Sequence, residues 1–130
     1  MALHVEVVSP ERVLYSGDGD MVACRTTEGE IAFLPGHAPF IGALAVAPVR
    51  VILPGNAEQA VAVHGGFIEV SNDHVIVLSD VAELPDQIDR ARAQAAQERA
   101  ETALKADPDD TEAAAALERA TLRVKVADSR

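Results

Sequence analysis

Hydrophobic and polar positions follow two different patterns along this chain. Up to Leu84, short runs rich in Val, Ile and Leu recur about every ten residues, separated by Gly, Pro, Asn and Asp. Such runs are typical of the strands of an antiparallel sandwich or barrel. After Leu84 there is no glycine, proline occurs only at positions 85 and 108, and alanine is interspersed with charged residues. This second pattern favours helices, so the character of the chain changes between residues 84 and 85.

Nine segments of the first part are predicted to be strands. They are residues 3–8, 12–15, 21–25, 31–34, 40–46, 49–53, 60–64, 67–70 and 75–79. Turn residues separate them, among them Pro54-Gly55-Asn56 and the pair Gly65 and Gly66, and the gap at residues 47–48 contains Pro48. Val61 and Val63 alternate with alanine, which indicates a strand covered on both faces. The predicted fold class is α+β: an N-terminal antiparallel β-sandwich of about ten short strands, followed by a C-terminal antiparallel two-helix hairpin.

The second part is predicted to form two helices joined by a turn that contains Pro108. Asp86 is expected to cap the first helix, with Asp89 three residues further on, and Asp109 with Glu112 to start the second. The expected apolar positions are Ile88, Ala91, Ala95 and Leu104 on the first helix and Ala113, Leu117, Ala120 and Val124 on the second. Because alanine buries little area, we expect a hairpin that is marginally stable and able to move.

Charge divides the chain at the same place. The net charge is −10; residues 1–84 carry 3 basic and 11 acidic groups, a net of −8, and residues 85–130 carry 8 and 10, a net of −2. We expect two domains, 1–84 for docking and 85–130 for regulation. An acidic chain is a poor partner for nucleic acid or anionic lipid. With one cysteine, no secretory signal and no apolar run of membrane-spanning length, a soluble cytoplasmic protein is expected.

Four arginines of the second part form the sharpest chemical signal. Arg92 and Arg99 are seven residues apart and share one face of a helix, and Arg119 and Arg123 are four apart on the next helix. Folding of the hairpin can bring the two pairs together, and guanidinium groups suit phosphate oxygens in geometry and charge. The alternative is a solvated face, with acidic neighbours as counter-charges.

Nothing in the sequence supports catalysis. His4, His37, His64 and His74 show no metal-ligand spacing and are interpreted as turn or surface residues. Glu28 and Glu30 are better explained by a hairpin tip than by acid–base chemistry. There is no G-x-x-x-x-G-K-[ST] loop, so a nucleotide bound here is not expected to be hydrolysed here.

Several segments, taken in order, resemble the epsilon subunit of the F-type ATP synthase over essentially the whole chain. They are Val7-Val8-Ser9-Pro10-Glu11, Glu28-Gly29-Glu30, Leu34-Pro35-Gly36-His37-Ala38-Pro39, Gly65-Gly66-Phe67-Ile68-Glu69-Val70 and Ile88-Asp89-Arg90-Ala91-Arg92-Ala93. The resemblance implies a non-catalytic rotor subunit of the central stalk, at the cytoplasmic face of the bacterial plasma membrane. Its implied partners are the gamma subunit, the c-subunit ring and, when the hairpin extends, the alpha/beta head, where the hairpin inhibits ATP hydrolysis.

The resemblance also implies particular contact residues. Glu30 and His37 match loops that face the c ring. Bacterial members of the ATP-binding type hold ATP, as a regulatory ligand, in the folded hairpin through an Ile/Leu-Asp-x-x-Arg-Ala motif and distal arginines. The matching positions here are Glu83, Ile88, Asp89, Arg92, Ala93, Arg99, Arg119 and Arg123. No other cofactor and no metal is implied.

Two other functions remain open from the residues alone. A free-standing β-sandwich binding module could use its helical hairpin only to dimerise. A hydrolase could use the histidines together with Glu28 and Glu30. Co-purification with a gamma subunit favours the rotor function, self-association favours the binding module, and turnover abolished by His37→Ala favours the hydrolase.

Overall fold

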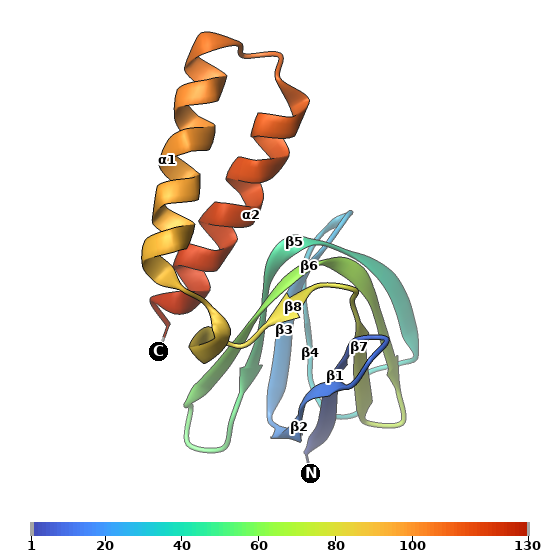
Figure 1. The fold of residues 1–130 in the computed structure, drawn as a ribbon. Coiled ribbons are helices and arrows are strands. Elements are labelled where there is room, and N and C mark those ends of the chain that lie inside the picture. Colours follow the sequence, from blue (N-terminus) through green and yellow to red (C-terminus); the bar gives the residue numbers. More distant parts are fainter. Residues whose placement is uncertain (1, 130) are drawn as a thin grey trace.

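The computed structural model describes residues 2–129, which form a β-sandwich with a helical hairpin standing on it (Figure 1). The elements are β1 (Leu3–Val8), β2 (Val13–Gly19), β3 (Met21–Thr26), β4 (Gly29–Phe33), β5 (Phe40–Ile52), β6 (Glu58–Ser71), β7 (His74–Leu78), β8 (Ala82–Glu83), the short 3-10 helix η1 (Pro85–Gln87), α1 (Arg90–Ala106) and α2 (Thr111–Ala127). The predicted fold class is confirmed, and the predicted boundary between residues 84 and 85 falls between β8 and η1.

The strands form one continuous sheet that folds over on itself. Its order is β2-β1-β7-β6-β5-β3-β4, with β8 paired to β6. Side chains from opposite ends of this order meet in a single core, for example Val5 of β1, Val22 of β3 and Phe33 of β4. Val, Leu and Ile supply most of this core. Among the described strands only β1 and β7 pair in parallel, which a wholly antiparallel sandwich does not include.

The described sheet has eight strands, because two predicted breaks between strands are absent and the short strand β8 was not predicted. Strand β5 runs on through Pro48, which lies in the stretch between Leu44 and Arg50 where pairing with β3 is interrupted. A proline is tolerated in a strand where no ladder hydrogen bond is needed from its nitrogen. Strand β6 likewise runs on through its two adjacent glycines.

Gly66 marks the place where β6 changes partner. Before it β6 pairs with β8, and after it with β7. Gly66 has a φ of 130°, and a Cβ atom there would lie 2.1 Å from the carbonyl oxygen of Leu78. Only glycine fits this backbone conformation and this close approach. The pair of glycines therefore permits a bend within one strand, where the sequence suggested a turn between two.

The helix starts differ from the predicted ones. Asp89 caps α1, since its side chain accepts a hydrogen bond from the backbone N–H of Arg92, whereas Asp86 lies in η1. Asp110, and not Asp109, caps α2 by accepting from the N–H of Ala113. With several Asp residues in succession, the cap is decided by the backbone conformation, which the sequence pattern does not specify.

Asp110→Ala should lower the free energy of unfolding by about 1 kcal/mol, because it leaves an N-terminal N–H of α2 without its acceptor. Asp109→Ala is the matched control, with the same loss of charge one residue earlier, and should cost clearly less. Amide hydrogen exchange in the first turn of α2 measures the difference. Equal losses of protection in the two variants would contradict the assigned cap.

The contact face of the hairpin is also rotated from the predicted one. On α1 the buried residues are Ala93 and Ala100, whereas Ala91 and Ala95 are exposed. On α2 the expected Ala113 and Ala120 are buried, and so are Leu122, Val126 and Ala127. The additional buried residues of α2 share an apolar cluster with Ala60 and Ala62 of the sheet, which a stripe for helix pairing alone does not anticipate.

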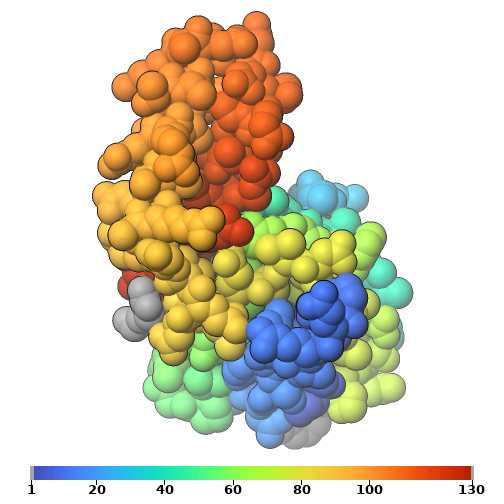
Figure 2. Space-filling model, in the orientation of Figure 1, coloured from blue at the N-terminus to red at the C-terminus, as the bar shows by residue number. Residues whose placement is uncertain are grey.

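The hairpin contacts the sheet through one end only. Figure 2 shows the helices projecting beyond the sandwich, with the turn between them far from the sheet. Ala60 and Ala62 on the outer face of β6 form a second apolar cluster with Ile88, Leu122 and Val126. This cluster covers the second face of β6, as the alternation of valine and alanine predicted. Neither helix among residues 2–129 is both long enough and apolar enough to cross a membrane.

Candidate functional site

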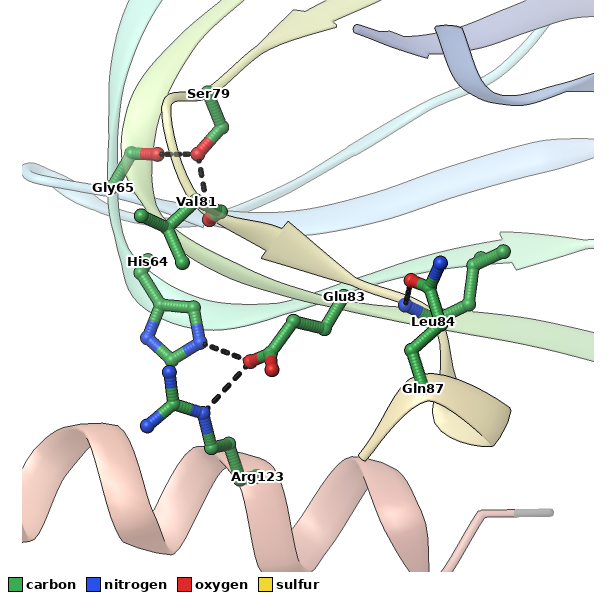
Figure 3. A network of polar contacts seen from close by, with 8 residues as sticks. All are labelled: His64, Gly65, Ser79, Val81, Glu83, Leu84, Gln87 and Arg123. Carbon is green, nitrogen blue, oxygen red and sulfur yellow. Dashed lines mark hydrogen bonds and ion pairs between the residues drawn. The ribbon is translucent and has the colours of Figure 1, made fainter. Parts of the chain in front are cut away.

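A polar cluster lies beside the apolar contact between the hairpin and the sheet (Figure 3). His64 projects from β6, Glu83 from β8 and Arg123 from α2. One carboxylate oxygen of Glu83, Oε1, is 2.9 Å from His64 Nε2 and accepts a hydrogen bond from Arg123 Nε at 2.8 Å. The side chains of His64, Glu83 and Arg123 are 5%, 24% and 33% exposed. Glu83 therefore joins the hairpin to the sheet.

The local sequence explains why these groups meet. Residues Ala60, Ala62 and His64 share one face of β6, because side chains alternate along a strand. That face is the one beneath α2. Glu83 comes from the short strand β8, which pairs with β6 at Ala62 and Val63. This pairing places the carboxylate of Glu83 beside the imidazole of His64.

The protonation of His64 follows from its surroundings. Burial lowers the pKa of His64, and the positive charges of Arg123 and Arg119 act in the same direction, whereas the contact with Glu83 opposes them. Burial is the largest of these effects. The imidazole is therefore favoured in its neutral form, with the Nε2–H donating to the acceptor-only carboxylate of Glu83.

The structure brings Glu83, Arg123 and Arg119 of the predicted nucleotide site into one region. Arg119 is close enough to influence His64, and its guanidinium pairs at 3.3 Å with Glu112, about two turns earlier on α2. Arg92 and Arg99 are exposed on α1, and neither guanidinium has an ion pair among the described residues. These two side chains are available for an anionic ligand.

The remaining predicted contacts of the nucleotide have structural roles in this conformation. Ile88 and Ala93 are buried in the apolar cluster beneath α2. Asp89 caps α1, and its Oδ1 accepts from the N–H of Arg92 at 3.1 Å. The segment that matches the nucleotide motif thus forms the start of α1 and its attachment to the sheet.

The two predicted c-ring contacts lie near each other in the chain but in different settings. Glu30 is exposed in β4, one residue after its start, and not in a loop; it borders a groove of about 740 Å³ beside the end of α2. His37 lies in the loop before β5, and its ring packs edge-on against Phe33 at 4.8 Å. Glu30 is exposed, and His37 is partly exposed.

His64 is the functional candidate that the sequence analysis missed. It was interpreted as a turn or surface histidine, but its side chain is almost wholly buried at the contact with the hairpin. The alternation of Ala60, Ala62 and His64 on one strand face was a usable signal. To conclude from this alternation that His64 is buried, however, one must know that the hairpin covers that face of β6.

Family models match both parts of the chain. Residues 2–85 match the model described as "ATP synthase, Delta/Epsilon chain, beta-sandwich domain". Residues 86–128 match "ATP synthase, Delta/Epsilon chain, long alpha-helix domain". Together the two models account for nearly all of the sequence.

Individual relatives agree with the family models. The ATP synthase epsilon chain of Shouchella clausii is 45% identical over 126 residues, which cover 96% of this chain and 94% of that one. The epsilon chain of Streptomyces griseus is 42% identical, covering 95% and 93%. A chain in a cryo-EM structure of the Euglena gracilis mitochondrial ATP synthase has the same fold, with a TM-score of 0.71, 21% identity, and coverage of 98% of this chain and 78% of that chain. The chain therefore belongs to the epsilon-chain family of the F-type ATP synthase, whose members are non-catalytic subunits of that complex.

Proposed function

We propose that this chain is a rotor component of the central stalk whose hairpin senses ATP. Its sandwich docks onto the gamma subunit and the c-subunit ring, at the cytoplasmic face of the bacterial plasma membrane. In the folded hairpin ATP is the regulatory ligand. The extended hairpin reaches the alpha/beta head and inhibits ATP hydrolysis.

The observation that carries the sensing role is the distribution of charge on the hairpin. Arg92 and Arg99 present guanidinium groups without ion pairs among the described residues, while Arg119 and Arg123 lie where α2 meets the sheet. Triphosphate oxygens suit such groups, because charge-assisted hydrogen bonds to guanidinium are stronger than neutral ones. A ligand that binds only the folded hairpin shifts the equilibrium away from the extended one.

Uncovered apolar side chains support the docking role. Ile41, Phe67 and Leu78 are 74%, 59% and 49% exposed. Phe67 pairs directly with Leu78 across β6 and β7, and Ile41 lies on the adjoining strand two positions from the partner of Phe67. Neighbouring exposed apolar side chains on one sheet mark an interaction surface. Because the chain belongs to the epsilon-chain family, the expected partner of this surface is another subunit of the stalk.

Arg92→Ala should weaken ATP binding to the isolated protein about 10- to 100-fold, the cost of a lost charge-assisted hydrogen bond. Arg92 holds no ion pair that the substitution would break among the described residues, so the fold should be retained. Lys105→Ala is the matched control, an exposed cation in the last turn of the same helix. Isothermal calorimetry measures both variants.

Two results would count against the nucleotide site. One is the absence of ATP binding to the unmodified protein at about millimolar ATP, a concentration at which even a weak complex forms. The other is an Arg92→Ala variant that binds as tightly as the unmodified chain.

The rotor role is tested separately, since the chain should co-purify with the gamma subunit. Self-association without gamma would favour the free-standing binding module.

A further inference from the structure

His64 is a buried titratable group that neither the proposed ATP site nor the docking surface uses. It follows Ala60 and Ala62 on the outer face of β6, and α2 covers that face. Its side chain is only 5% exposed. Because the residues around it come from β6, β8 and α2, any change in its charge acts directly on the contact between hairpin and sheet.

The two ring nitrogens of His64 have different surroundings. Nε2 lies 2.9 Å from Glu83 Oε1, the same oxygen that accepts from Arg123 Nε. A carboxylate accepts hydrogen bonds only, so Nε2 carries the hydrogen. Nδ1 is buried and has no hydrogen-bond partner among the described residues. A proton added at Nδ1 would create an N–H without an acceptor, in a place with almost no water.

The charged groups that face His64 come from two elements. Among residues 2–129, the anion that acts on His64 is Glu83 on β8, and the cations are Arg119 and Arg123 on α2. A positive imidazole would gain attraction to Glu83 but would meet two guanidinium groups and lose its hydration. Burial outweighs the attraction, and the pKa of His64 is lowered from its ordinary value near 6.5.

We propose that His64 is a positioning residue that makes docking of the hairpin on the sheet pH-dependent. Its Nε2–H holds the Glu83 carboxylate on Arg123, and protonation at Nδ1 releases α2 from the sheet. The imidazole of His64 holds the Glu83 carboxylate from the sheet, and the guanidinium of Arg123 contacts the same carboxylate from α2. When the ring is neutral, all three groups are compatible in one buried contact. A charged ring makes that contact unfavourable.

The direction of the pH dependence follows from linkage. In the docked hairpin His64 binds a proton less tightly than it does once α2 has moved away and water reaches the ring. Docking is therefore fully stabilised above the ordinary histidine pKa of about 6.5 and weakens as the pH falls toward the lowered value. Each pKa unit between docked and undocked states makes undocking about tenfold more favourable in acid.

The test measures the position of α2 in the full-length, nucleotide-free protein. Spin labels on cysteines introduced at Glu69 in β6 and Thr111 at the start of α2, both exposed, report the distance between sheet and hairpin. The native Cys24 is buried, and burial raises the pKa of its thiol to about 11, so it is not labelled under mild conditions. Spectra are recorded from about pH 8 to about pH 5.5, a range centred near the histidine pKa.

The undocked population should rise as the pH falls through this range. His64→Gln should abolish the rise, because the amide nitrogen can still donate to Glu83 but does not titrate. His74→Gln, a substitution at an exposed histidine, is the matched control and should keep the rise. A merely structural role of His64 would shift the amount of docking in His64→Gln without flattening its pH profile.

A second measurement keeps the proposal falsifiable if the variant does not fold. NMR titration of the unmodified protein should give the His64 ring a pKa below about 6.5, the value of an unperturbed histidine. A value at or above that, a docked population that does not respond to pH, or equal profiles for His64→Gln and the unmodified chain would each overturn the proposal. Since no nucleotide is present, these outcomes leave the proposed ATP site to be judged by calorimetry alone.

Discussion

Phe33→Ala should destabilise the sandwich by about 3–5 kcal/mol, the usual cost of removing a buried phenylalanine and leaving a cavity. Phe33 is 0% exposed at the end of β4 and is the largest fully buried side chain among the described residues. Its ring packs against Phe40 at 5.3 Å and against His37 at 4.8 Å. Loss of the ring removes both of these contacts and leaves a cavity in the core.

Phe67→Ala is the matched control, because the same atoms are removed from a side chain that is 59% exposed. In the isolated protein it should cost much less than Phe33→Ala, since little buried area is lost. Urea denaturation of both variants gives the difference in the free energy of unfolding. Equal midpoints for the two variants would contradict the assignment of Phe33 to the centre of the core.

Removal of residues 85–130 should raise the rate of ATP hydrolysis by the assembled complex. We expect an increase of about fivefold or more, the lower end of typical coupling between regulatory states. In the proposed function the hairpin extends toward the catalytic head, and the truncated chain has no hairpin to do so. The fifteen-residue core of the sandwich lies wholly before residue 85, so the truncated chain should still fold and dock.

The control for this experiment is the complex without the chain, which separates loss of the hairpin from loss of the whole subunit. The amount of truncated chain in the purified complex is measured by gel densitometry. A rate equal to that of the complex with the full-length chain would leave the hairpin without an inhibitory role. A rate that rises only when the truncated chain is missing from the complex would point to failed assembly.

Much of the fold could be predicted because its signals are local. Valine-rich runs between turn residues predicted strands, and the absence of glycine after Leu84 with the rise in alanine predicted the helices. The errors arose where a local signal has two meanings. Pro48 and the two glycines of β6 often end a strand, but here pairing with several neighbours carries the strands through.

The candidate site was partly accessible from sequence. The spacing of the arginines suggested an anion-binding hairpin, and the family resemblance added the motif around Asp89. The arginines lie on α1 and α2, and Asp89 caps α1. The contact between Glu83 and Arg123 and the burial of His64 were not accessible. Those residues are 19 to 59 positions apart, and only the docking of α2 on β6 brings them together.

The sequence by itself determined the two-part architecture, the chemical character of each part and the family. These depend on composition, short-range periodicity and ordered motifs, all of which act over a few residues. The tertiary structure alone decided which aspartate caps each helix, which face of α2 is buried, and that His64, Glu83 and Arg123 form one joint. The physical reason is that burial and the pairing of charges depend on which distant segments exclude water from one another, and no local pattern specifies that.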